Sequence, residues 1–319
     1  MLRKTLLLTL LLALLTACAP QATPTVVPVA TDLPATDAPT AAPAGITFTD
    51  GLDREINLDG PAQRVVSLAP SNTEILFAVG AGSQMVGRDE FSDYPAEAAS
   101  LESVGGSFGE YSAEAIVALE PDLVLAAEIN TPELVKQLED LGLTVYYLKN
   151  PVTLEAMYVN LEIVGQLTGH DVAELVDSLK ARVAAVDEKI APISARPTVF
   201  YEIDASDASK PYTASSGTFI DLLIQRAGGQ NIAAGFDSLY PQISLEQLVV
   251  FNPGIILLGD SLYGTTPESV SARAGWETIE AVKSGNIFPF DDNLASRPGP
   301  RLVDGLEQLA KLLHPELFK

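Results

Sequence analysis

The chain has 319 residues, of which 42 are acidic and 19 are basic, so its formal net charge at pH 7 is −23. A chain this acidic is a poor binder of nucleic acid and of anionic membrane surfaces. The length allows two domains of ordinary size, and the one cysteine, Cys18, excludes an intrachain disulfide.

Residues 1–17 have the features of an export signal. Arg3 and Lys4 give a positive start, and residues 6–15 form a short, mostly apolar run. Because this run is too short to span a bilayer comfortably, we predict a cleaved leader. The letters LTAC that end at Cys18 resemble the bacterial lipobox, which implies that Cys18 is lipidated and becomes the mature N-terminus. An ordinary secretory leader with an incidental cysteine is the alternative.

Residues 19–44 are mainly Ala, Pro and Thr, with almost no large side chains. This composition cannot bury a core and favours an extended chain with a reach of roughly 80 Å at ~3.1 Å per residue. We therefore predict a tether over residues 18–45 that starts at the lipidated Cys18.

The N-terminal half, residues 46–168, alternates between expected strands and helices. Residues 46–58 alternate around Asp50-Gly51, which predicts a hairpin. Residues 71–74 have the spacing of a capping box and should open the first helix. The expected strands are 64–68, 85–87 and 144–148, and the expected helices are 71–79, 132–141 and 154–167. This alternation favours a largely parallel sheet covered by helices.

Residues 171–190 contain no Gly or Pro, and their apolar residues recur at helical spacing. They predict an amphipathic helix of about 30 Å at 1.5 Å per residue, ended by Pro192. We place a connecting segment at residues 169–194, although a further surface helix would show the same pattern. The C-terminal half, residues 195–319, again alternates. Its expected elements are strands 198–202 and 287–290, and helices over 218–227, around Trp276 and over 300–313.

One stretch occurs in both halves, as residues 112–128 and residues 244–260. Each copy has a hydroxyl residue suited to an N-cap, a glutamate in the first helical turn, a proline that ends the helix and a buried type of strand. The matched positions include Ser112 and Ser244, Glu114 and Glu246, and Pro121 and Pro253. One helix, turn and strand unit in each half implies a two-lobed α/β protein.

These phrases resemble the solute-binding proteins of ABC importers whose lobes are joined by one long helix, which serve cobalamin, haem and iron-siderophores. Further phrases that carry the resemblance are residues 64–82, 92–95 and 296–315, so it covers nearly all of residues 46–319. The cobalamin-binding branch is the most similar. The resemblance implies two Rossmann-like lobes with central sheets, joined by a single long helix, with a ligand cleft between them.

The resemblance also implies a partner. In the family, a first-turn glutamate of each lobe docks on arginines of the permease, and Glu114 and Glu246 fall on those positions. The expected partner is a permease dimer with its ATPase subunits, and the binding protein itself is expected to be a monomer. A first-turn glutamate is also common for reasons of the helix dipole alone.

Aromatic and charged residues on loops after expected strands are the candidate ligand contacts. They are Phe91, Tyr94, Phe108, Tyr212, Tyr240, Asp291, Asp292 and Arg297. In two facing α/β sheets such loops line the cleft, and aromatic rings on them suit a large planar ligand. Each aromatic could instead pack against its own loop, and Arg297 could be a structural residue beside Pro298.

The resemblance assigns corrin contact to Tyr94, and it places Phe108 and Tyr240 where cobalamin binders have tryptophans. The pocket's Asp and Arg correspond to Asp292 or Asp291 and to Arg297. The chain departs from the pattern because both tryptophans are smaller aromatics and no aromatic occurs near Ala127. The spacing from Asp to Arg is also one residue longer.

Metal and catalytic signals are weak. The two histidines, His170 and His314, are expected on the surface, and no convergent set of metal ligands is visible. No GxSxG, Walker-type or HExxH motif occurs, and residues 215–218 fit a loop with an N-cap. We therefore predict a non-enzymatic protein with no metal site and no cofactor of its own.

The prediction is an extracytoplasmic, lipid-anchored solute-binding protein that delivers a large cofactor or metal chelate to an ABC permease. Cobalamin or a related corrinoid is the first choice of ligand, and a ferric siderophore or haem is the second. A cleft enzyme and a scaffold lipoprotein are the alternatives from other classes.

Overall fold

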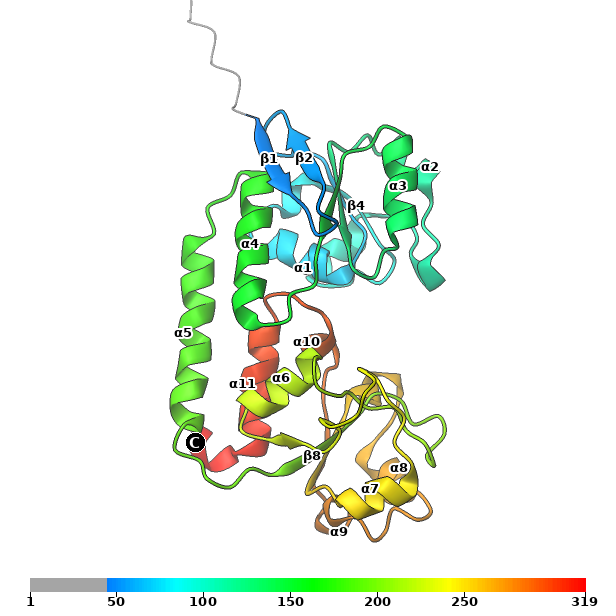
Figure 1. Ribbon diagram of the computed structural model, residues 1–319, viewed down its shortest axis with the longest axis vertical. Coiled ribbons are helices and arrows are strands. Elements are labelled where there is room, and N and C mark those ends of the chain that lie inside the picture. Colours follow the sequence, from blue (N-terminus) through cyan, green and yellow to red (C-terminus); the bar gives the residue numbers. More distant parts are fainter. Residues whose placement is uncertain (1–44) are drawn as a thin grey trace, which may run out of the picture. The chain divides into compact units, whose positions relative to one another are not determined.

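The computed structural model describes residues 45–319, except for the side chain of Phe108 (Figure 1). The predicted leader, Cys18 and the tether through residue 44 lie outside the described residues. None of the helices in the described part combines the length and apolar character needed to cross a membrane.

The predicted hairpin is confirmed as the antiparallel strands β1 (Ile46–Thr49) and β2 (Glu55–Leu58). Its turn is fixed by the buried Asp50, whose carboxylate accepts hydrogen bonds from the backbone amides of Leu52 at 2.9 Å and Tyr147 at 3.1 Å. Although burial opposes it, hydrogen bonds from Arg54 hold the pKa of Asp50 below its usual value. The hairpin is thereby joined to the sheet that contains Tyr147.

The first lobe has a five-stranded sheet in the order β5-β4-β3-β6-β7, with every pair parallel. The strands are β3 (Val65–Ser67), β4 (Met85–Arg88), β5 (Glu102–Ser103), β6 (Leu123–Ala127) and β7 (Val145–Leu148). The helices are α1 (Pro70–Ala78), α2 (Ala113–Ala118), α3 (Pro132–Asp140) and α4 (Leu154–Thr168). Alternate residues of β6 enter two different cores, one shared with α1 and α4 and the other with α2 and α3. The sheet is therefore covered by helices on both faces.

The predicted capping box at residues 71–74 is wrong. Helix α1 begins at Pro70, its N-cap residue Ala69 makes no side-chain cap bond, and Glu74 lies inside the helix. Proline is favoured at the first helical position because its fixed φ suits the helix and its missing N–H has no partner there. The side chain of Glu74 is therefore not part of a helix cap, and it accepts hydrogen bonds from residues outside its own helix.

The predicted connecting helix is confirmed as α5 (Ala173–Ile190), which lies beside α4 and leads from the first lobe to the second (Figure 1). Its buried residues recur at helical spacing and belong to the core that α4 and α11 (Leu302–Leu313) also enter. Arg182 of α5 donates two hydrogen bonds of 2.9 Å to Glu307 of α11. Arg226 donates to Asp187 of α5 at 2.8 and 2.9 Å. These bonds attach α5 to the second lobe.

The second lobe has a parallel four-stranded sheet in the order β11-β10-β8-β9. The strands are β8 (Thr198–Glu202), β9 (Gln230–Asn231), β10 (Ile255–Leu258) and β11 (Ile287–Pro289). The remaining helices are α6 (Phe219–Arg226), α7 (Leu245–Phe251), α8 (Pro267–Ser271), α9 (Glu280–Ser284) and α10 (Asn293–Ser296). Residues of α6 and α11 fill one core beside this sheet, and residues of α7, α8 and α9 fill another. The predicted fold of two α/β lobes joined by one long helix is confirmed.

Two local predictions, one on the repeated stretch and one on Trp276, had different outcomes. Ser112 and Ser244 are N-caps, accepting hydrogen bonds from the amides of Ala115 at 3.1 Å and Gln247 at 3.2 Å, as the repeat predicted. Trp276, by contrast, lies in a turn between α8 and α9 and not in a helix. Its indole is fully buried and donates a hydrogen bond to the carbonyl of Ala208, which is far away in the sequence. Tertiary packing therefore sets its conformation.

Candidate ligand-binding cleft

A cavity of about 430 Å³ lies where the strands of both sheets end. From the first lobe it is lined by residues after β3, β4, β5, β6 and β7, and from the second lobe by residues after β10 and β11. The lining is Ala69, Pro70, Ser71, Asp89, Phe91, Gly106, Tyr111, Ala127, Ile129, Asn150, Tyr263, Asp292, Asn293, Ser296, Arg297 and Pro298. Open α/β sheets bind ligands outside the carboxyl ends of their strands. This cavity is therefore the candidate site.

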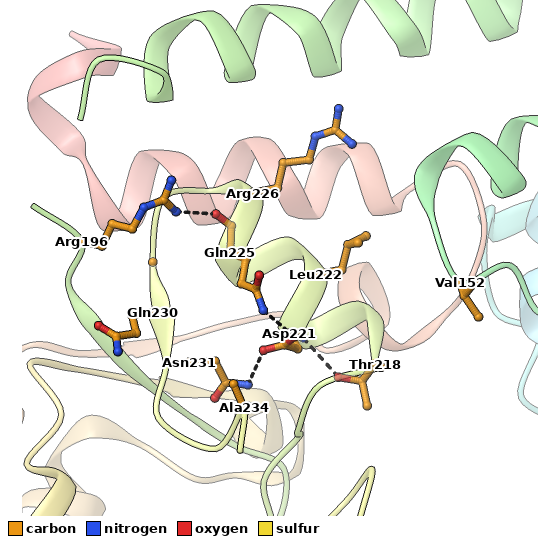
Figure 2. Close-up of a pocket in the computed structure, with 12 residues that line it drawn as sticks. Val152, Arg196, Thr218, Asp221, Leu222, Gln225, Arg226, Gln230, Asn231 and Ala234 are labelled. Atoms are coloured by element: carbon orange, nitrogen blue, oxygen red, sulfur yellow. Dashed lines mark hydrogen bonds between the residues drawn. The ribbon is translucent and has the colours of Figure 1, made fainter. Parts of the chain in front are cut away.

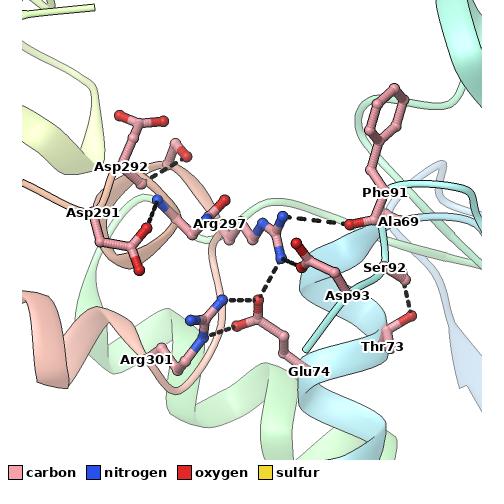
Figure 3. A network of polar contacts seen from close by, with 12 residues as sticks. Ala69, Thr73, Glu74, Phe91, Ser92, Asp93, Asp291, Asp292, Arg297 and Arg301 are labelled. Atoms are coloured by element: carbon pink, nitrogen blue, oxygen red, sulfur yellow. Dashed lines mark hydrogen bonds and ion pairs between the residues drawn. The ribbon is translucent and has the colours of Figure 1, made fainter. Parts of the chain in front are cut away.

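Beside the cavity, an ionic network joins the two lobes (Figure 3). The carboxylate of Glu74 on α1 is buried and accepts hydrogen bonds from Arg297 at 3.1 Å and from Nε of Arg301 at 2.9 Å. Arg297 also donates to Asp93 at 2.7 Å and to the carbonyl of Phe91 at 3.4 Å. From the sequence, Glu74 was expected only as part of a capping box and Arg301 was not singled out, because no local pattern connects residues so far apart in the chain.

Arg297 thus lines the cavity and also binds two carboxylates of the opposite lobe. Its guanidinium forms an ion pair with Glu74, and the same carboxylate also pairs with Arg301. Both arginines are therefore neutralised by protein carboxylates, and neither offers a free positive charge to a ligand.

The two adjacent aspartates have different roles. Asp292 lines the cavity and accepts a hydrogen bond of 2.7 Å from the hydroxyl of Tyr201. Burial and the charge of Asp292 raise the pKa of Tyr201 well above its usual value, so this hydroxyl stays a donor. Asp291 instead accepts from the backbone amide of Asn293 at 3.1 Å (Figure 3). Of the predicted pair, Asp292 is the one that reaches the cavity.

The predicted aromatic residues are distributed unevenly. Phe91 lines the cavity, whereas Tyr94, Tyr212 and Tyr240 are exposed and are not part of its lining. The ring of Tyr94 is covered by the guanidinium of Arg301, at 3.9 Å from the ring centroid. Partial burial of its ring and the charge of Asp292 raise the pKa of Tyr240, whose side chain is 55% exposed. The side chain of Phe108 lies outside the described part.

Other lining residues were missed. Asp89 follows β4 directly, is buried, and accepts hydrogen bonds from the amide of Phe91 at 2.9 Å and from the hydroxyl of Ser92. Burial raises the pKa of Asp89. Ile129 and Tyr263 are exposed and follow β6 and β10. The signal that could have found them is their position a few residues after a buried strand.

The candidate docking glutamates occupy matched positions. Glu114 lies in the first turn of α2 and Glu246 in the first turn of α7, and both are exposed. The structure thus leaves each carboxylate accessible on its own lobe.

A larger cavity of about 890 Å³ runs along α6 (Figure 2). The carboxylate of its buried Asp221 accepts hydrogen bonds from Asn231 at 2.9 Å and Gln225 at 2.7 Å. Arg196 donates to the carbonyl of Gln225 at 2.9 Å. Because these polar groups satisfy one another, we favour the smaller cavity at the strand ends as the site.

The expectation that His314 lies on the surface is wrong. Its side chain is buried, and its Nε2 lies 3.3 Å from the carbonyl of Gly228. His170 is half-buried, with its Nε2 at 2.7 Å from Oε1 of Gln84. Within residues 45–319, no group of three or more His, Cys, Asp or Glu side chains is placed to hold a metal ion.

The family described as periplasmic binding protein matches residues 65–294. The chain belongs to the periplasmic binding protein family. This confirms the family that the sequence motifs indicated. The chain is 32% identical to an uncharacterized ABC transporter substrate-binding lipoprotein, YvrC, of Bacillus subtilis, over 86% of this chain and 87% of the relative. It is 31% identical to a cobalamin-binding protein of Halobacterium salinarum, over 87% of this chain and 76% of the relative.

Solved structures of other periplasmic binding proteins share the fold. The vitamin B12 binding protein BtuF of Vibrio cholerae superposes with a TM-score of 0.67 at 28% identity, covering 81% of this chain and 99% of that chain. The heme-binding protein RhuT of Roseiflexus superposes with a TM-score of 0.71 at 27% identity, covering 80% of this chain and 99% of that chain.

Proposed function

We propose that this protein is an extracytoplasmic, lipid-anchored substrate-binding protein of an ABC importer, and that its ligand is cobalamin or a related corrinoid. Residues 1–17 are the signal peptide, and residues 18–45 are the tether from the lipidated Cys18. The lobes are residues 46–168 and 195–319, with residues 169–194 connecting them. The protein acts as a monomer, carries no cofactor of its own and performs no catalytic step.

The charge of the cavity supports a corrinoid over the other two ligand classes. Arg297 is its one cationic lining residue within the described part, and Glu74 and Asp93 already neutralise it. Asp89 and Asp292 add carboxylates. Haem carries two propionates and many ferric siderophores are anionic, so both would need unpaired cations. A corrin ring whose side chains are neutral amides does not need unpaired cations in its site.

The test is a calorimetric titration of the purified protein with cyanocobalamin, haem and ferric siderophores. We expect one-to-one corrinoid binding with a submicromolar Kd. Tyr94→Ala should weaken it about tenfold, because this variant removes the aromatic ring to which the resemblance assigns corrin contact. Binding of only haem or a ferric chelate would keep the transport class and overturn the corrinoid assignment. Absence of binding to the whole panel would overturn the proposed ligand set.

We further propose that Glu114 and Glu246 dock on basic pockets of the permease. Exposed carboxylates on both lobes can set register and association rate at such a contact. The double variant Glu114→Lys, Glu246→Lys should lower uptake more than tenfold while the ligand Kd stays within twofold.

The matched control for docking is Glu133→Lys with Glu268→Lys. These glutamates are also exposed in the first turns of helices, α3 and α8, so the change in net charge is identical. Uptake by the control should stay close to that of the wild type. An equal loss of uptake in both double variants would show a general charge effect and refute specific docking.

A further inference from the structure

Two large apolar side chains that no motif singled out line the cavity from opposite lobes. Ile129 of the first lobe is 73% exposed, and Tyr263 of the second lobe is 89% exposed. Single exposed apolar residues are common on protein surfaces. Exposed apolar side chains that converge on one concave site are characteristic of ligand or partner contact.

The loop that carries Tyr263 is anchored at its base. The segment η4 (Gly259–Tyr263) begins where β10 ends, and a Cβ on Gly259 would lie 2.6 Å from the ring of Tyr201. Ser261 donates a hydrogen bond of 3.1 Å to the carbonyl of Phe290. Thr265 donates a bond of 2.8 Å to Asp260. The base of the loop is therefore fixed to the sheet while the ring of Tyr263 is left uncovered.

The loop that carries Ile129 is fixed in a similar way. The side chain of Asn130 accepts a hydrogen bond of 2.7 Å from the amide of Ala127. It also donates to the carbonyl of Leu68 at 3.1 Å and to the hydroxyl of Tyr111 at 2.8 Å. Three strand-end segments are thus joined around the buried Asn130, and Ile129 beside it remains exposed.

We propose that Ile129 and Tyr263 are ligand-contacting residues that determine affinity, one from each lobe, and that both pack on apolar surface of the bound corrinoid. This rests on the proposed function. Their contacts need little ordering on binding because both loops are already held by side-chain hydrogen bonds. The tyrosine ring adds a flat apolar surface with few rotatable bonds.

The experiment measures the Kd of cyanocobalamin for Ile129→Ala, Tyr263→Ala and Tyr263→Phe. Each alanine variant should weaken binding about tenfold, whereas Tyr263→Phe should stay within threefold because the ring is retained. The matched controls are Val152→Ala and Leu262→Ala, which remove exposed apolar side chains that do not line this cavity. Both controls should bind as the wild type does.

The urea midpoints of all variants should be unchanged, because the altered side chains are exposed. A wild type that binds corrinoid, with both alanine variants within twofold of it, would overturn the inference while the proposed function stands. If the wild type binds haem or a ferric siderophore instead, the corrinoid assignment fails, and a tenfold loss for that ligand in both alanine variants supports only the ligand contact of the two side chains. If the wild type binds none of the panel, the proposed function fails and the inference fails with it.

Discussion

Replacing Glu74 with alanine should lower the free energy of unfolding by about 3–5 kcal/mol, because it removes the carboxylate partner of the largely buried Arg301 and leaves Arg297 with only the exposed Asp93. The Glu74 side chain is almost fully buried and forms ion pairs with two arginines of the opposite lobe, Arg297 and Arg301. Urea unfolding monitored by far-UV circular dichroism measures the change. Glu74→Gln keeps one hydrogen-bond acceptor and should cost less than Glu74→Ala.

Asp93→Ala is the matched control for this prediction. Asp93 binds the same arginine at 2.7 Å, but its side chain is 67% exposed. Exposed ion pairs contribute about 0–1 kcal/mol, so this variant should unfold close to the wild-type midpoint. Equal destabilisation by the two variants would mean that burial of Glu74 is not what makes the network strong.

The second large effect is expected for Arg273→Ala, again about 3–5 kcal/mol near pH 7. Arg273 donates to both carboxylate oxygens of the fully buried Glu202, at 2.6 and 2.8 Å, and stacks on Trp276 at 4.6 Å. Next to Glu202, the buried Oδ1 of Asp260 has no hydrogen-bond partner among the described residues. Removing the cation therefore leaves two neighbouring carboxyl groups uncompensated.

This destabilisation should depend on pH. Burial raises the pKa of Glu202, the neighbouring Asp260 adds to the rise, and Arg273 opposes it. A carboxyl group with a raised folded pKa destabilises the fold above that pKa, and the penalty is relieved as the pH falls toward the unfolded value of about 4.3. Arg273→Ala raises the folded pKa further. The loss of stability should therefore shrink as the pH falls from 7 to 5.

Two variants make the pH experiment decisive. Adding Glu202→Gln to Arg273→Ala should restore part of the lost stability at pH 7 and flatten the pH dependence. Lys136→Ala removes an exposed cation paired with Asp140 and should leave the urea midpoint unchanged at each of these pH values. An Arg273→Ala loss that is constant from pH 7 to 5 would contradict the assigned role of Glu202.

Elements with strong local signals were predicted well from the sequence. The strand at residues 198–202 has the predicted bounds, and Ser112 and Ser244 cap their helices as expected. Such signals depend on neighbours within a few residues. The start of α1 was missed because the spacing at residues 71–74 fits a capping box, while Pro70 already begins the helix.

The candidate site was likewise predicted only in part from the sequence. Resemblance brought Asp292 and Arg297 to attention, and both line the cavity. Ile129 and Tyr263 carry no motif, and only the packing of two sheets brings them to one cavity. His314 was expected on the surface because it precedes a proline near the end of the chain. Its burial results from a close approach to Gly228, where a Cβ would lie 2.7 Å from its Nε2.

The attachments of the connecting helix define where the molecule can bend. Gln84 donates to the carbonyl of Thr168 at 2.9 Å and bonds His170, so the chain up to His170 moves with the first lobe. From Arg182 onward, α5 is held by α11 and Arg226 and moves with the second lobe. Any change in the angle between the lobes must be absorbed over the few turns between these anchor points. A rotation between the lobes would therefore twist this part of α5 and strain the ion pairs that Glu74 forms with Arg297 and Arg301.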